Sequence, residues 1–327
     1  MGEGIEMREK LTEYWRVYGA TEAAKSILEE FLRKVNSSKS WEDLLAAIDY
    51  LYEACSARPY SALLVNASRD VLQEFLSSGA SSVYEAVNTI SSKISRMLDM
   101  VENMTLQAAL IAAKRIQDDE VIFTISYSGT VLKVFENLVA RGARVRAIVT
   151  ESRPFGEGVE MARALRSLGV GVTLIVDSAI RSFIKRASRV VIGAEAIAAN
   201  GATINKVGTA LLAIAAKEAR VRLFVVSGSY KIVPETFFGE LVGSPEMEIQ
   251  DMPQDLIAIG VKSYAPLFEA VPTGYIDAII TEKGLISPPA IPYIVRETFG
   301  SWPPRVRRIE DLYREARTLM LRRLRTP

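Results

Sequence analysis

Polar side chains follow several short apolar runs in the second part of the chain. Ser126–Thr130 comes after the first run and opens a helical pattern, whose free backbone N–H groups suit a phosphate. Arg153 follows the second run and carries the fork of donors that clamps phosphates. Glu195 follows the fourth run, and Asn205 and Lys206 precede the next helical pattern. These residue types predict a pocket for a small phosphorylated ligand.

Each segment also has a structural interpretation. Ser128-Gly129-Thr130 before a helix is ordinarily an N-cap, and Glu195 after an apolar strand is compatible with a buried, paired carboxylate. The sequence contains neither GxGxxG nor GxxxxGK[ST], which argues against a dinucleotide site or a P-loop. The functional interpretation gains weight because the polar segments recur at successive strand ends.

The chain has no histidine and a single cysteine, Cys55. Catalytic triads that need histidine, histidine-ligated zinc and disulfide frameworks are therefore excluded. Any acid–base chemistry must use Asp, Glu, Lys, Tyr or Cys55. We expect no metal and no cofactor.

The formal net charge is +1 over 327 residues, so the composition does not indicate a nucleic-acid partner. No apolar run reaches the roughly 18 residues that span a bilayer, and no secretory leader is recognised in the first residues. We therefore expect a cytoplasmic protein without a membrane partner.

The residues after 118 alternate between β-rich runs and helical patterns. Such alternation is typical of an α/β fold with a mainly parallel sheet, in which ligands bind beyond the carboxyl ends of the strands. The expected strands are Val121–Thr124, Val145–Val149, Val172–Val176, Val190–Ile192, Leu223–Val226 and Ile276–Ile280.

Residues 1–117 carry helical periodicity instead, so we divide the chain into a helical domain (1–117) and a Rossmann-like domain (118–327). Ser40 and Asp43 resemble a capping box that opens one of the expected helices.

Two further segments leave alternatives open. The acidic segment 239–254 could be a lid, a partner-binding loop or a tolerated insertion. The arginine-rich end, 305–325, could offer a basic surface, but an amphipathic last helix docked on its own domain is the interpretation that we favour.

The motifs together resemble the family of the α, β and δ subunits of translation initiation factor 2B. That family includes isomerases of methylthioribose-1-phosphate and ribose-1,5-bisphosphate. The resemblance covers most of the chain and rests on Ser126–Leu132, Thr150–Pro154, Val191–Ile197, Asn200–Gly201, Asn205–Thr209 and Tyr275–Glu282, with Tyr18–Ala20 and Arg58 upstream.

The resemblance implies an N-terminal helical domain, a Rossmann-like C-terminal domain, a homodimer or higher oligomer, and a possible translation-factor partner. It also implies a ligand such as a ribose phosphate or an AMP-like nucleotide. The ligand-binding positions that it points to are Tyr18, Gly19, Arg58, Ser126, Ser128, Gly129, Arg153, Glu195, Asn205 and Lys206.

Three positions depart from the isomerases of the family. Ser126 stands where they carry cysteine, Glu195 where they carry aspartate, and Tyr18 where they carry a phosphate-binding arginine. A serine hydroxyl is a poorer proton donor than a thiol, and a carboxylate displaced by about 1 Å loses roughly 10²-fold in rate. We therefore predict a protein like the α subunit, which binds its ligand without catalysis. The alternatives are a divergent aldose–ketose isomerase, with Glu195 as base and Ser126 or Tyr127 as acid, and a scaffold with a vestigial pocket.

Overall fold

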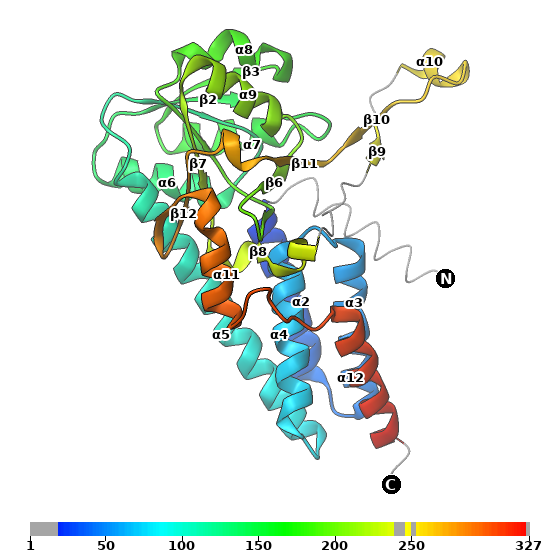
Figure 1. The fold of residues 1–327 in the computed structure, drawn as a ribbon. Helices are drawn as coiled ribbons and strands as arrows, with labels where there is room; N and C mark the ends of the chain where they lie inside the picture. The colour runs from blue at the N-terminus through cyan, green and yellow to red at the C-terminus, as the bar shows by residue number, and fades with distance from the viewer. Residues whose placement is uncertain (1–18, 239–245, 250–252, 325–327) are drawn as a thin grey trace.

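The computed structural model describes residues 19–238, 246–249 and 253–324. Tyr18 lies outside these residues, so its predicted role stays a prediction. Figure 1 shows an elongated molecule with a helical half at one end and a sheet half at the other. Helix α5 extends from the helical half to the sheet half.

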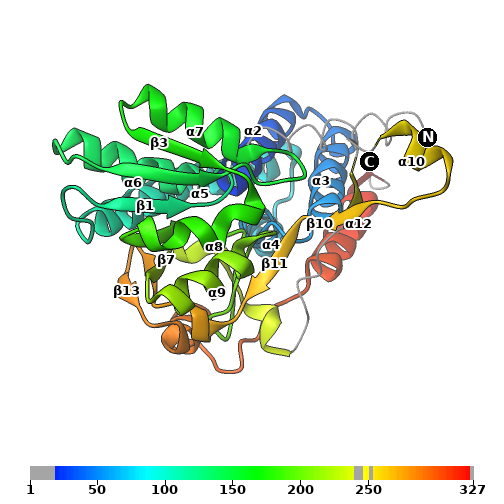
Figure 2. The same cartoon turned by 90° about the horizontal axis from the view of Figure 1, so that it is seen from above.

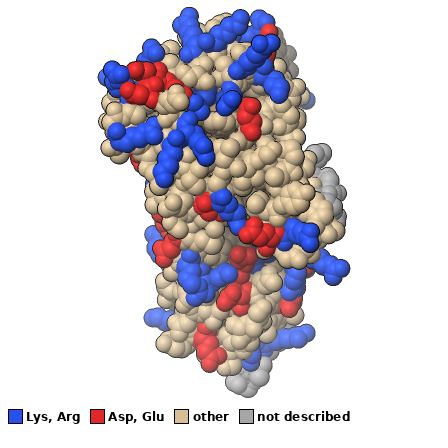
Figure 3. All heavy atoms as spheres, turned by 60° about the vertical axis from the view of Figure 1, so that its left-hand side comes forward, with Lys and Arg blue, Asp and Glu red and all other residues tan. Residues whose placement is uncertain are grey.

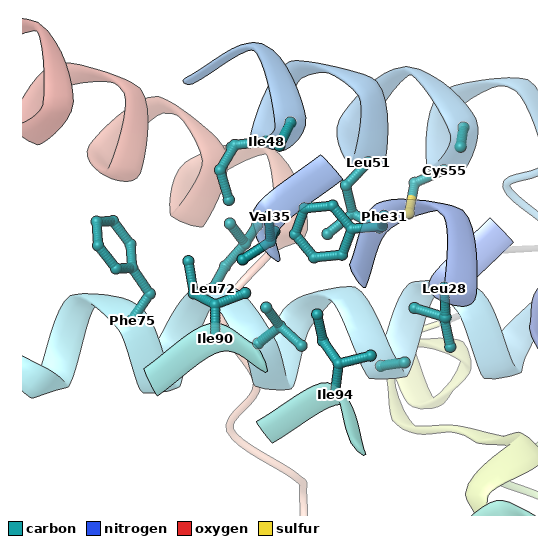
Figure 4. Packing of buried hydrophobic residues seen from close by; sticks show 14 of the residues in the cluster. Leu28, Phe31, Val35, Ile48, Leu51, Cys55, Leu72, Phe75, Ile90 and Ile94 are labelled. Atoms are coloured by element: carbon teal, nitrogen blue, oxygen red, sulfur yellow. The ribbon is translucent and has the colours of Figure 1, made fainter. Parts of the chain in front are cut away.

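The helical half is built by amphipathic helices that bury one face each. Ser40 Oγ accepts the Asp43 backbone N–H at 3.1 Å and the Asp43 carboxylate accepts the Ser40 N–H at 3.0 Å, which confirms the predicted capping box. Phe31, Leu72 and Ile90 meet in the core that Figure 4 shows, each at most 1% exposed. The helices are α2 (Ala20–Ser37), α3 (Trp41–Ala57), α4 (Ala62–Ser78) and α5 (Val83–Ala113).

The last helix, α12 (Ile309–Leu324), belongs to the same core. Its Leu312 and Met320 are fully buried among the residues of α3 and α4. Tyr313 stacks on Tyr52 with ring centroids 3.9 Å apart and donates to Asp49 Oδ1 at 2.8 Å. The arginine-rich end therefore docks its apolar face, although on the helical half rather than on the sheet.

The main sheet has the doubly wound order β13-β12-β7-β4-β1-β2-β3, with every pair parallel except β12 and β13. This confirms the predicted α/β fold. The order reverses between β1 and β4, and ligands bind at such a switch point in open α/β sheets. The strands are β1 (Val121–Thr124), β2 (Arg146–Thr150), β3 (Gly171–Ile175), β4 (Arg189–Ile192), β7 (Arg222–Val226), β12 (Ala278–Thr281) and β13 (Gly284–Ile286).

Helices cover both faces of this sheet, as Figure 2 shows from above. One face packs on α6 and on the last turns of α5, where Ala108, Ala112 and Phe135 share a core with strand residues. Packing thus crosses the predicted division at residue 117 in both directions, through α5 and α12. The covering helices are α6 (Gly129–Ala140), α7 (Glu157–Ser167), α8 (Ile180–Phe183), α9 (Thr209–Ala219) and α11 (Ile291–Phe299).

A second, small sheet was not predicted. Its order is β11-β6-β5-β8, and the turn between β5 and β6 contains Asn200 and Gly201. This sheet presents the residues that follow β4 to the switch point. Its strands are β5 (Ala196–Ala198), β6 (Thr203–Lys206), β8 (Ile232–Val233) and β11 (Phe268–Val271).

The described part of the acidic segment forms β9 (Glu246–Glu248), which pairs antiparallel with β10 (Tyr264–Pro266). Helix α10 (Gln254–Ala258) lies at the tip of the projection that Figure 1 shows. Whether this arm acts as a lid, a partner-binding loop or an insertion stays a prediction.

Lys and Arg side chains are unevenly spread over the surface. On the face in Figure 3 they are most numerous at the end formed by the sheet half, and acids lie among them there as well as lower down. Among the described helices, none is long and apolar enough to cross a membrane.

Candidate functional site

A pocket lies at the carboxyl ends of β1 and β4, where the strand order reverses. The space between its walls is about 620 Å³, with the open solvent at its mouth included. Most of the predicted ligand-binding positions line it, namely Gly19, Arg58, Ser126, Ser128, Gly129, Glu195, Asn205 and Lys206.

The loop after β1 forms one wall. The Ser126 backbone N–H donates to Ser152 Oγ at 2.7 Å, and Ser126 has a positive φ of 61°. Ser128 caps α6, because its Oγ accepts the Val131 N–H at 3.3 Å. The predicted N-cap is thus confirmed. It does not exclude a role in ligand binding, because the same residues also line the pocket.

Close approach explains the glycine in this wall. A Cβ on Gly129 would overlap the carboxylate of Glu22, which α2 brings to the start of α6. Glu22 was missed by sequence reasoning, because nothing in a helical repeat marks which surface carboxylate faces another domain.

Glu195 follows β4 and points its carboxyl into a buried setting. The side chain is 5% exposed, and its backbone N–H donates to Ile204 O at 2.9 Å, which fixes the residue to the β5–β6 hairpin. Burial raises the pKa of Glu195, and the nearby charges of Arg58 and Lys231 oppose that rise. Within the described residues, Glu195 Oε1 has no hydrogen-bond partner. A carboxyl in this state is suited to exchange a proton with a ligand.

Lys231 is a pocket residue that sequence reasoning missed. It closes a short 3-10 helix, Ser229–Lys231, after β7, and it is 3% exposed. Its Nζ donates to Ala194 O at 2.7 Å, next to Glu195 in the chain. Burial lowers the pKa of Lys231, with Glu195 opposing. Its position after the fifth polar strand end was the available signal.

The opposite wall carries an ion pair. Lys206 Nζ lies 2.6 Å from Glu157 Oε1, and the two side chains are 4% and 13% exposed. Lys206 also lies over the Phe155 ring, 5.0 Å from its centroid. Phe155 and Glu157 were both missed, although they follow Arg153 by two and four residues.

Arg153 is the predicted position that the structure does not bring to the pocket wall. Its side chain is exposed, and its backbone N–H donates to Asp177 Oδ2 at 2.8 Å. The turn that carries Arg153 follows β2, which lies one strand away from the switch point between β1 and β4. Asp177, which follows β3, accepts hydrogen bonds from this turn and holds it in place. No group of three or more His, Cys, Asp or Glu side chains that could hold a metal ion occurs in the ranges that the structure covers.

The chain is similar to curated archaeal enzymes over nearly its whole length. A protein of Archaeoglobus fulgidus is 38% identical over 299 residues, covering 90% of this chain and 93% of the relative. A protein of Pyrococcus furiosus is 35% identical over 317 residues, covering 91% and 94%. Both are named ribose 1,5-bisphosphate isomerase.

These relatives contradict the prediction of a protein that binds without catalysis. That prediction gave three substituted positions more weight than similarity along nine-tenths of the chain. One of the three, Glu195, keeps its carboxyl and has two cations nearby, so the substitution at this position did not remove the acidic group.

A solved structure of the Pyrococcus horikoshii translation initiation factor eIF-2B has a TM-score of 0.76 at 29% identity, covering 88% of this chain and 98% of that one. The model of the initiation factor 2 subunit family matches residues 16–288. By both its sequence and its fold, the chain belongs to the initiation factor 2 subunit family.

Proposed function

We propose that this protein is an isomerase that converts ribose 1,5-bisphosphate, an aldose derivative, into the corresponding 2-ketose bisphosphate. The observation that carries the proposal is the buried carboxyl of Glu195 beside Arg58 and Lys231 at the switch point of the sheet. The names of the two archaeal relatives support the choice of substrate.

The reaction conserves all atoms and needs two proton transfers. The ring opens when the ring oxygen takes a proton and its bond to C1 breaks. In net terms a hydrogen then moves from C2 to C1 with its bonding electrons, and the C2 hydroxyl loses its proton as it becomes a carbonyl. One group must therefore donate a proton and another must accept one.

Glu195 is the proton acceptor in this proposal. Its raised pKa makes it a stronger base than an exposed carboxylate, and its Oε1 is not engaged by another described residue. Lys231 is the proton donor, because burial lowers the pKa of its ammonium and so makes it a stronger acid. A serine hydroxyl at Ser126 would be a far weaker acid than this ammonium.

The cationic side chains lie on two walls of the pocket, and each wall can bind one of the two phosphates. Arg58 and the N–H groups at the start of α6, near Ser128 and Gly129, suit one phosphate. Lys206, with Asn205 beside it, suits the other. Glu195 lines the same pocket, so a ligand held at both phosphates would bring its reacting carbons within reach of this carboxyl.

Turnover tests the proposal directly. Purified protein is incubated with ribose 1,5-bisphosphate, and the ketose product is followed by NMR of carbon and phosphorus. The matched pair is Glu195→Gln and Glu160→Gln, since Glu160 is exposed on α7. We expect Glu195→Gln to lose roughly 10²–10⁴-fold in kcat, the usual share of general acid–base catalysis, and Glu160→Gln to lose nothing measurable. An inactive wild-type protein, or equal rates in both variants, would refute the proposal.

Finer expectations remain proposals. We propose a homodimer that can assemble further, which native mass spectrometry counts. Binding of an AMP-like nucleotide and of a translation-factor partner is tested by thermal shift and by co-purification.

A further inference from the structure

Glu157 is an acidic residue in a pocket that should attract phosphate. Its Oε1 lies 2.6 Å from Lys206 Nζ, the cation that suits a phosphate on this wall. Its second oxygen, Oε2, is buried without a hydrogen-bond partner among the described residues. The carboxylate of Glu157 thus lies beside the position at Lys206 where a phosphate would bind.

Lys206 can serve Glu157 and a phosphate at once, because an ammonium has three N–H donors. Both anions would then contact one nitrogen and lie within a few ångströms of each other. Two negative charges so close, with little water between them, repel each other strongly, so keeping both ionised costs free energy. Either Glu157 takes up a proton or the phosphate is repelled.

Protonation is the easier course for Glu157. Burial already raises its pKa, while Lys206 opposes the rise and Asp177 adds to it. Asp177 is occupied by the backbone N–H groups of Ser152 and Arg153, at 2.9 and 2.8 Å. Across the pocket the charged groups are Glu22, Arg58, Glu195 and Lys231.

We propose that phosphate binding at Lys206 is coupled to the uptake of one proton by Glu157, which sets the pH range in which the pocket accepts a phosphorylated ligand. Protonated Glu157 turns from a competitor into a donor that hydrogen-bonds the phosphate. The inference rests on the proposed function only in taking the ligand to be a sugar phosphate.

Calorimetry of the full-length protein with D-ribose 5-phosphate tests the coupling. Above pH 7.5 this ligand is a dianion, because its second pKa is about 6. Titration in two buffers of different ionisation enthalpy gives the number of protons taken up. We expect about one for the wild type, with Kd weakening about tenfold per pH unit.

Glu157→Gln keeps the shape of the side chain and removes its charge. We expect proton uptake near zero, a Kd that is flat with pH, and binding at least about tenfold tighter than wild type at pH 8.5. Glu195→Gln is the matched control, a second buried carboxyl in the same pocket, and it should keep the uptake. The wild-type titration stands alone if Glu157→Gln fails to fold.

Uptake that persists in Glu157→Gln, uptake lost only in Glu195→Gln, or no binding by the wild type would each overturn the inference. Proton-coupled binding without turnover would refute the isomerase proposal alone. Turnover without coupling would refute the inference alone.

Discussion

Gly193 joins β4 to the loop that carries Glu195, and it has no room for a side chain. A Cβ placed there would lie 3.0 Å from Ser128 Cβ and closer still to Ser128 Oγ. Its φ is not in the left-handed region, so the backbone itself would accept alanine. Gly193→Ala therefore tests one thing, the close approach of the β4 loop to the β1 loop.

The size of the effect follows from that contact. Restoring an optimal carbon–carbon separation from 3.0 Å requires the two loops to part by about 0.5–1 Å. Overpacking of this kind costs about 1–3 kcal/mol of the free energy of unfolding. A displacement of about 1 Å between Glu195 and the phosphate-binding wall should lower kcat/KM roughly 10²-fold.

The assay compares Gly193→Ala with Gly274→Ala, where a Cβ would meet no atom within 4 Å. Steady-state kinetics with ribose 1,5-bisphosphate and urea unfolding are measured for both. Adding Ser128→Gly to Gly193→Ala removes the clash and should restore most of the loss, since glycine as an N-cap costs only a few tenths of a kcal/mol. Wild-type kinetics in Gly193→Ala, or no recovery in the double variant, would refute the reasoning.

The remaining predictions concern the core, the thiol and the pH profile. Leu312→Ala should lower the free energy of unfolding by about 2–5 kcal/mol because α12 is part of the helical core, whereas exposed Arg314→Ala should change it little; urea titration measures both. Cys55 is buried, with its pKa raised to about 12, so native protein at pH 8 should react with a thiol reagent only at the rate of its opening, and a fast reaction would contradict the burial. The pKa of Glu195 is raised, so kcat/KM should fall as the pH drops through a value above the usual range of glutamate. The variant Lys231→Arg keeps the positive charge and should show the same fall on the acidic side of its pH profile. A fall at the usual pKa of glutamate would contradict the assignment of Glu195 as the base.

The parallel strands of the main sheet could be predicted because they are short, nearly continuous apolar runs, buried along most of their length except in the edge strand β3. The antiparallel edge strand β13 was missed. Val121–Thr124 was placed with the bounds that the structure has, and the other runs shift by only one or two residues at their ends. The small sheet could not, because a strand such as Ala196–Ala198 is too short for any periodicity. Tertiary pairing with its neighbours, rather than local propensity, makes it a strand.

The location of the pocket was predictable and its charge pairs were not. Strand-end residues such as Ser128 and Glu195 meet because parallel strands share one edge. Glu22 and Glu157 instead face the pocket through the packing angle of a helix, which a single sequence does not encode in a readable pattern. The docking of α12 on the helical half was unpredictable for the same reason, since an amphipathic face does not name its partner.

The loss of a catalytic residue cannot be argued from one loop alone. The resemblance places Ser126 where the isomerases of the family carry cysteine, and this substitution suggested that the proton donor is gone. Lys231 lies in the same pocket on a different element, with its ammonium next to the Ala194 carbonyl and its pKa lowered by burial. A donor supplied from there would make the thiol dispensable. The proposal requires that Lys231→Met lose far more activity than Ser126→Ala, and the reverse order would return the proton donor to the loop after β1.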